Sequence, residues 1–141
     1  MKPIISRKPP RFILLDDDLL ALTMAEKLIR RYCRHSEIIK FFASKDAIEF
    51  LETREFIAND TDTVFLTDLH MPEIDGFAVL DRMKNTFKTL GDRLHVFVIS
   101  AAACPEEIRR ALSYNCVIGF VTKPFCDEKI EQIIRCIQYP L

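Results

Sequence analysis

Five short runs of apolar residues recur along the chain and predict five β-strands. They are Phe12–Leu15, Glu37–Phe42, Thr63–Thr67, Leu94–Ser100 and Val117–Thr122. Three of these runs are almost continuously apolar, at residues 12–15, 64–66 and 96–99. Such runs are typical of strands that are buried on both faces of a parallel sheet.

Between the runs, apolar residues recur at the three- and four-residue spacing of an amphipathic helix. Five helices are predicted, with apolar faces on Ala21, Met24, Ala25, Leu28 and Tyr32; on Ala47, Ile48 and Leu51; on Phe77, Leu80 and Met83; on Ile108, Ala111 and Leu112; and on Ile130, Ile133, Ile134 and Ile137. Ser44 and Asp75 are predicted N-caps, and Pro105 suits the first turn of the fourth helix.

The alternation of strands and helices predicts an α/β fold, with a doubly wound parallel sheet covered on both faces. Right-handed crossovers place the C-terminal ends of all strands at one edge of the sheet, where such folds bind ligands. Four strands end in polar side chains, namely Asp16–Asp18, Asp68, Ser100 and Lys123. The sequence therefore predicts that four distant segments converge on a single site.

Length and composition limit the class of protein. The chain has 141 residues, which fits one domain, and we expect a flexible leader over residues 1–10 and the domain over residues 11–141. The net charge of -1 gives no general attraction to nucleic acid or anionic lipid. No apolar stretch approaches the roughly 18 residues of a membrane span. The five cysteines lack metal-binding spacing and are expected to be reduced, so a cytoplasmic location is predicted.

The clustered carboxylates require a counter-charge. Like charges ~4 Å apart cost about 4 kcal/mol per pair at an effective dielectric of about 20, so Asp16, Asp17 and Asp68 would bind protons or enclose a cation. An all-oxygen set without histidine or thiolate favours Mg²⁺. Asp18 taken alone is more simply explained as a cap of the first helix.

Lys123 and Ser100 complete the predicted chemistry. The ammonium of Lys123 can reach a carboxylate or phosphate oxygen at the strand end, and Ser100 offers a hydroxyl. Lys123–Pro124 is a candidate cis peptide bond. We interpret Asp68 as a nucleophile that accepts a phosphoryl group, with Mg²⁺ on Asp17 and Asp68 offsetting the developing charge.

Four segments together resemble the receiver domain of two-component response regulators, over about residues 11–138. They are Leu14–Asp18, Asp68–Gly76, Val98–Ala101 and Thr122–Phe125. The resemblance implies a flavodoxin-like (βα)5 fold whose five parallel strands have the order 2-1-3-4-5. This order agrees with the alternation derived from the apolar pattern.

The resemblance also implies a role for each matched position. Asp68 matches the phosphoacceptor, and Asp16 and Asp17 match the acidic pair, with Asp17 the expected direct Mg²⁺ ligand. The other matches are His70, whose backbone carbonyl would bind the metal; Ser100 with its neighbour Ala101, at the switch hydroxyl; Lys123, which would bind the phosphoryl group; and Phe120, the switch aromatic. His70 and Ala102 occupy the two positions that tune phosphate lifetime in the family.

The function implied is that of a signalling switch. A sensor histidine kinase or histidine phosphotransfer domain would phosphorylate Asp68, and the surface of the fourth helix, fifth strand and fifth helix would then change for an unknown output protein. The chain would catalyse only its own phosphorylation and dephosphorylation. We expect a stand-alone receiver because the sequence stops at Leu141, as a monomer or weak dimer with no contact to nucleic acid or membrane.

Two alternatives remain at this point. A haloacid-dehalogenase-like phosphatase would use Asp16 as the nucleophile, but it would leave the Asp68 turn without a task. It would also need a late acidic pair directly after a strand, whereas Asp127 and Glu128, which follow Lys123, are expected at the start of a helix. A receiver-like domain that never takes phosphate would act by protein contacts alone. A dinucleotide-binding domain is disfavoured because no glycine-rich loop follows the first strand.

Overall fold

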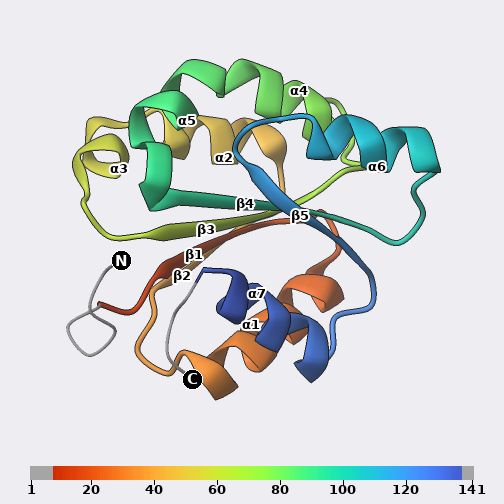
Figure 1. Cartoon of the computed structure of the whole chain (residues 1–141), viewed down its shortest axis with the longest axis horizontal. Helices are drawn as coiled ribbons and strands as arrows, with labels where there is room; N and C mark the ends of the chain where they lie inside the picture. Colours follow the sequence, from red (N-terminus) through yellow and green to blue (C-terminus); the bar gives the residue numbers. More distant parts are fainter. Residues whose placement is uncertain (1–7, 138–141) are drawn as a thin grey trace.

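The computed structural model describes residues 8–137, and the architecture is a five-stranded parallel sheet between two layers of helices (Figure 1). Residues 1–7, which form most of the predicted leader, and residues 138–141 lie outside the described residues. The strands are β1 (Arg11–Leu15), β2 (Ile38–Phe41), β3 (Thr63–Asp68), β4 (Leu94–Ser100) and β5 (Val117–Thr122). Their order is β2-β1-β3-β4-β5 and every pairing is parallel, which confirms the predicted flavodoxin-like fold.

Helices cover both faces of the sheet. They are α1 (Leu19–Tyr32), α2 (Ser44–Leu51), α3 (Arg54–Ala58), α4 (Gly76–Arg82), α5 (Lys84–Leu90), the 3-10 turn η2 (Gly91–Arg93), α6 (Pro105–Leu112) and α7 (Asp127–Cys136). Figure 1 shows α1 and α7 on one side of the sheet and the helices α2–α6 on the other. Each helical layer therefore buries one face of the central strands.

The prediction of five helices was wrong, because two of the connections each hold two helices. After α2, the hydroxyl of Thr53 accepts the backbone N–H of Phe56 and starts α3 anew. Between α4 and α5, the buried residue Met83 has φ -93° and ψ 5°. This conformation interrupts the helix, so that one continuous apolar stripe is divided between two short helices. The apolar pattern continues across such breaks, so periodicity alone does not reveal them.

Two of the predicted helix starts are confirmed. The Asp75 side chain accepts the backbone N–H of Ala78 at 2.9 Å at the start of α4, and Pro105 is the first residue of α6. Ser44 was wrongly predicted as an N-cap. It is the first residue of α2 instead, and its hydroxyl donates to the carbonyl of Ile74 at 2.7 Å, which ties α2 to the loop after β3.

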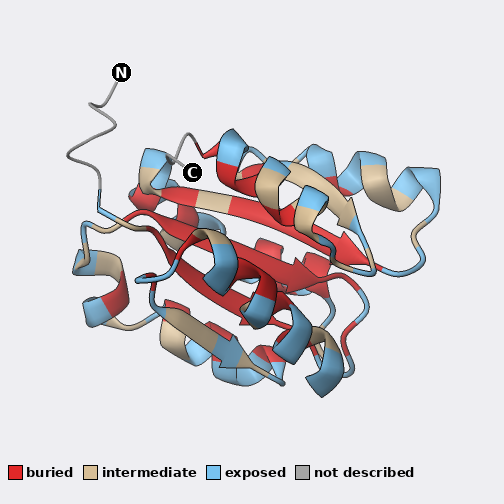
Figure 2. Cartoon of the chain, turned by 90° about the horizontal axis from the view of Figure 1, so that it is seen from below, coloured by how far each residue is buried: buried red, intermediate tan, exposed pale blue. Residues whose placement is uncertain are grey.

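The core consists of two apolar clusters, one on each face of the sheet. Figure 2 shows the central strands as almost entirely buried, and every residue of β1 and β3 is buried. Arg11 is a buried basic residue at the start of β1. Its guanidinium lies 4.3 Å from the ring centroid of Phe56 and donates to Thr63 Oγ1 at 2.6 Å and to the carbonyl of Phe56 at 3.0 Å. This buried arginine fastens α3 to the sheet.

Within residues 8–137, none of the helices combines the length and the apolar character that crossing a bilayer requires.

Candidate functional site

The predicted site residues meet at the C-terminal edge of the sheet. Asp16 directly follows β1, Asp68 ends β3, Ser100 ends β4 and Lys123 directly follows β5. Because adjacent strands are in parallel register, with Asp68 opposite Ile99 and Ser100 opposite Thr122, these strand ends lie side by side. The structure thus brings together four segments that are remote in the sequence.

Three carboxylates form the acidic part of the site. One carboxylate oxygen from each of Asp16, Asp17 and Asp68 lies within 4.8 Å of the others. Asp16 and Asp68 are buried, whereas Asp17 is exposed at the rim. Asp18 points elsewhere, since its side chain accepts the N–H groups of Leu20 and Ala21 as the N-cap of α1.

Lys123 bridges the two buried carboxylates. Its Nζ lies 2.5 Å from Asp16 Oδ2 and 3.1 Å from Asp68 Oδ2, and its side chain is 16% exposed. Burial works to lower the pKa of Lys123, but the hydrogen bonds to Asp16 and Asp68 outweigh it and raise the pKa. Lys123 therefore carries a positive charge at neutral pH between two acids.

Burial also shapes the chemistry of Asp16. It raises the pKa of the Asp16 carboxyl, and the nearby charge of Asp68 acts in the same direction. The hydrogen bonds from Lys123 and from the backbone N–H of Asp18 oppose this shift only in part. A second positive charge at this position would favour the ionised form of Asp16.

The loop after β3 holds Asp68 in place. The backbone N–H of His70 donates to Asp68 Oδ1 at 3.3 Å, and the N–H of Leu69 donates to the carbonyl of Ile99 at 2.9 Å. The loop returns at Gly76, whose N–H donates to the carbonyl of Leu69 at 2.8 Å. A Cβ at Gly76 would lie 2.7 Å from the carbonyl oxygen of Asp68, so only glycine fits this return.

The His70 ring makes a contact that the sequence did not predict. Its Nε2 lies 2.9 Å from the carbonyl oxygen of Ala102 and 3.7 Å from Glu107 Oε2, so the ring spans from the β3–α4 loop to the β4–α6 loop. The predictions for His70 were that its backbone carbonyl would bind the metal and that it occupies a position that tunes phosphate lifetime, and neither named a partner for the ring. No spacing in the sequence connects positions 70 and 107, because their proximity arises from the sheet topology.

Ser100 is buried and hydrogen-bonded within its own loop. Its hydroxyl donates to the carbonyl of Ala102 at 3.1 Å, and the N–H of Ala102 donates back to Ser100 Oγ at 3.2 Å. The neighbouring Ala101 is exposed. Phe120 is half-buried and packs against the apolar cluster beneath α2–α6. The Lys123–Pro124 peptide bond is cis.

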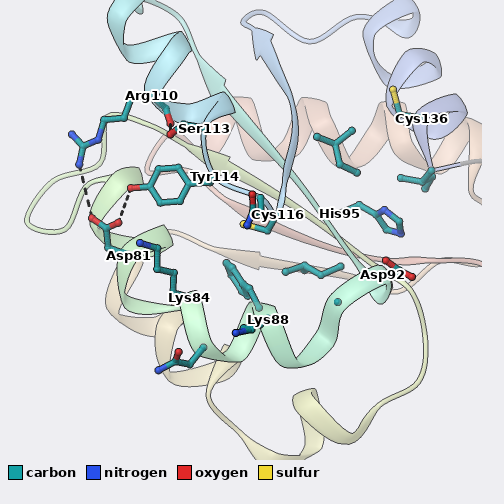
Figure 3. A pocket seen from close by; sticks show the side chains of 17 residues that line it. Asp81, Lys84, Lys88, Asp92, His95, Arg110, Ser113, Tyr114, Cys116 and Cys136 are labelled. Atoms are coloured by element: carbon teal, nitrogen blue, oxygen red, sulfur yellow. Dashed lines mark hydrogen bonds and ion pairs between the residues drawn. The ribbon is translucent and has the colours of Figure 1, made fainter.

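A broad groove elsewhere on the molecule is not lined by any of the predicted site residues (Figure 3). It has a volume of about 1220 Å³ and lies between α5, the start of β4 and the α6–β5 loop. At one side of it, the Tyr114 hydroxyl donates to Asp81 Oδ1 at 2.7 Å, and Arg110 Nη2 lies 3.9 Å from Asp81 Oδ2. The ion pair between Arg110 and Asp81 joins α6 to α4. Since the groove holds none of the predicted site residues, the candidate site is the strand-end edge.

Comparison with known proteins identifies the family to which this geometry belongs. The model of the response regulator receiver domain family matches residues 12–135. The chain is a member of this family. This assignment leaves the phosphatase alternative, with Asp16 as nucleophile, without support.

Relatives of this receiver domain occur in longer regulatory proteins. The gliding motility regulatory protein of Myxococcus xanthus is 30% identical over 102 residues, which cover 72% of this chain and 12% of that protein. The response regulator MprA of Mycobacterium sp. (strain KMS) is 25% identical over 129 residues, which cover 92% of this chain and 50% of that protein. The chain thus spans half or less of the length of these two relatives.

Solved receiver structures share the fold. A two-component response regulator from Cytophaga hutchinsonii superposes with a TM-score of 0.80 at 24% identity, covering 93% of this chain and 98% of that one. A response regulator receiver protein from Dyadobacter fermentans gives a TM-score of 0.77 at 23% identity, with 92% and 98% of the two chains covered.

Proposed function

We propose that this receiver domain is a phosphoacceptor switch in which Asp68 takes a phosphoryl group from a phosphohistidine. The observation that carries the proposal is the placement of Lys123, 3.1 Å from Asp68 and 2.5 Å from Asp16, beside the group of three carboxylates. An ammonium and an acidic cluster beside one buried carboxylate suit phosphoryl transfer, which depends on positioning and charge.

The donor set fits Mg²⁺. The carboxylates of Asp16, Asp17 and Asp68 offer only oxygen ligands, which Mg²⁺ prefers. Asp17, exposed at the rim, would be a direct ligand together with Asp68 and the backbone carbonyl of His70. When bound, the ion would offset negative charge on the phosphoryl oxygens and favour ionised carboxylates at the site.

The transfer step requires no separate base from the chain. A carboxylate oxygen of Asp68 forms a bond to phosphorus while the P–N bond of the phosphohistidine breaks. The imidazole nitrogen leaves with the bonding electron pair. Lys123 turns from the carboxylates toward a phosphoryl oxygen, and the positions of both groups at the strand ends make this movement short. The receiver carries out this reaction on itself and is not a turnover enzyme.

The donor would be a sensor histidine kinase or a histidine phosphotransfer domain. At the edge that carries Asp68, α1 begins with two strongly exposed apolar side chains, Leu19 (61%) and Leu20 (72%). Exposed leucines beside a reactive group are suited to contact with a protein donor. We infer that they form part of the donor-binding surface.

Phosphorylation would be read through Ser100 and Phe120. It replaces one carboxylate charge at Asp68 with roughly two negative charges on phosphoryl oxygens. The Ser100 hydroxyl would leave the carbonyl of Ala102 for one of these oxygens, and Phe120 would turn into the space it leaves. The surface of α6, β5 and α7 would then change, and an output protein would bind it.

The energy of such a switch is within reach of a few contacts. Moving an equilibrium from 1:99 to 99:1 requires about 5.5 kcal/mol of differential stabilisation. Hydrogen bonds to charged groups contribute about 1.5–3 kcal/mol each. Bonds from Lys123, Ser100 and a backbone N–H to the phosphoryl group would therefore suffice.

The proposal is tested with a small phosphodonor. Acetyl phosphate with Mg²⁺ should label the protein, and either Asp68→Asn or removal of Mg²⁺ by chelation should abolish the label. Asp18→Asn is the matched control, because Asp18 caps α1 outside the three-carboxylate cluster, and it should leave labelling intact. Labelling of the Asp68→Asn protein at the wild-type rate would refute the proposal.

A further inference from the structure

Lys129 makes an unusual set of contacts beside the site. It is the third residue of α7, and its Nζ donates to three oxygens: the carbonyl of Thr122 at 2.6 Å, the hydroxyl of Thr122 at 3.2 Å and the carbonyl of Pro124 at 3.0 Å. These acceptors belong to the residues immediately before and after Lys123. All three protons of one ammonium are thus directed at the backbone segment that carries the site lysine.

Lys129 lies in the first turn of α7, where a lysine is unfavourable for the helix itself. The N-terminal turn of a helix carries partial positive charge, so a lysine there is disfavoured by the helix dipole. Two acids of the same helix pair with arginines, because Asp127 lies 2.9 Å from Arg31 and Glu131 lies 3.5 Å from Arg135. The Lys129 ammonium is directed back toward the end of β5 instead. Residues that go against the local preferences of a helix are found mostly at functional or strained sites.

The segment that Lys129 holds has few other supports. Among residues 8–137, β5 is an edge strand that pairs with β4 alone, and it ends at Thr122. Beyond that point, the N–H of Lys123 donates to the carbonyl of Ser100 at 3.0 Å. The hydrogen bonds from Lys129 fasten the same segment from the side of α7. Together they fix the point from which the Lys123 side chain extends.

We propose that Lys129 is a positioning residue, which holds Thr122–Pro124 so that the Lys123 ammonium meets both Asp16 and Asp68. The expected effect on the phosphorylation rate rests on the proposed function. The expected effect on the ion pairs of Lys123 with Asp16 and Asp68 does not. A side chain displaced by about 1 Å can cost up to about 100-fold in rate, so a loss of positioning is expected to be measurable.

The test compares three variants. Lys129→Met removes the ammonium, Lys129→Arg keeps donors that can reach carbonyl oxygens, and Lys45→Met is the matched control. Lys45 is an exposed lysine in the first turn of α2, which also starts at the C-terminal edge of the sheet. It therefore controls for the loss of one positive charge near an anionic phosphodonor.

Two measurements are made on each protein. The first is the side-chain ammonium signal of Lys123 by NMR, which is protected from exchange when the group is held between carboxylates. The second is the rate of labelling by acetyl phosphate with Mg²⁺. Lys129→Met should lose the protected signal and slow labelling about tenfold, whereas Lys129→Arg and Lys45→Met should stay close to wild type.

The outcomes separate the two proposals. A protected Lys123 signal and an unchanged rate in Lys129→Met would overturn the positioning role. Equal losses in Lys129→Met and Lys45→Met would overturn it as well, because they would show a general charge effect. If the wild-type protein is not labelled at all, the proposed function fails, and the Lys123 signal still decides whether Lys129 positions it.

Discussion

Gly76 packs against the backbone of Asp68 so closely that an added Cβ would lie 2.7 Å from the Asp68 carbonyl oxygen and 2.9 Å from the Cα of Leu69. Both neighbours are backbone atoms that cannot rotate away. The start of α4 and the end of β3 are therefore locked together, and the position of Asp68 depends on the absence of a side chain at residue 76.

This contact predicts that Gly76→Ala destabilises the fold and disturbs the site. Overpacking of this kind costs about 1–3 kcal/mol, so the midpoint of urea unfolding should fall clearly. Gly119→Ala is the matched control, since its Cβ would meet no backbone atom and only the side-chain ring of Phe97 at 3.3 Å. If both variants had the same unfolding free energy as wild type, the close packing at Gly76 would be contradicted.

Ser100 is predicted to couple phosphorylation to the rest of the molecule. Ser100→Ala removes the hydroxyl that bonds to Ala102 and should still allow labelling of Asp68. In NMR spectra, the phosphorylated and unphosphorylated forms of the variant should differ much less in α6, β5 and α7 than those of wild type. Two forms that remain as distinct as in the wild-type protein would show that the coupling runs through other residues.

Leu20 is predicted to contact the phosphodonor protein. Leu20→Lys should slow transfer from a phosphohistidine domain, because it places a charge on an exposed apolar surface, but it should not affect labelling by acetyl phosphate. Leu112→Lys is the comparison, because Leu112 is 49% exposed on α6. The idea would be wrong if Leu20→Lys reduced both reactions equally or neither of them.

The buried thiol of Cys33 predicts a pH dependence of stability. Burial raises the pKa of Cys33 to about 11 from an ordinary value of 9.0. In the unfolded chain the thiol loses its proton first, so the unfolded state binds fewer protons between these values and stability falls as pH rises from about 9 to about 11. The effect is at most about 1.4 kcal/mol per pH unit.

Urea unfolding at a series of pH values measures this effect, with Cys33→Ala as the reference. The wild-type protein should lose more unfolding free energy over this range than the variant. At pH 8, thiol-directed labelling should be fast at the exposed Cys104, Cys126 and Cys136 and slow at Cys33. Rapid modification of Cys33 in the folded protein would contradict the burial on which the prediction rests.

The strands and the convergence of the site could be predicted because both depend on short-range patterns. Continuous apolar runs mark the central strands, and the parallel topology then brings Asp16, Asp68, Ser100 and Lys123 to one edge. The helix breaks at Thr53 and Met83 could not be predicted, because the apolar stripe continues through them.

The contacts that support the site also could not be predicted from the sequence. The approach of His70 to Glu107 and the hydrogen bonds of Lys129 to Thr122 and Pro124 depend on how loops from different strands turn. For Lys129 there was one available signal, a lysine placed against the dipole in the first turn of a helix that follows the site lysine. For His70 the sequence holds no comparable signal.

The most direct test of the central claim locates the phosphoryl group. The protein is labelled with acetyl phosphate and Mg²⁺, the acyl phosphate is trapped by borohydride reduction, and the modified residue is identified by mass spectrometry of peptides. A single modification at Asp68, absent without Mg²⁺, is the predicted result. Modification at Asp16 in place of Asp68 would contradict the account.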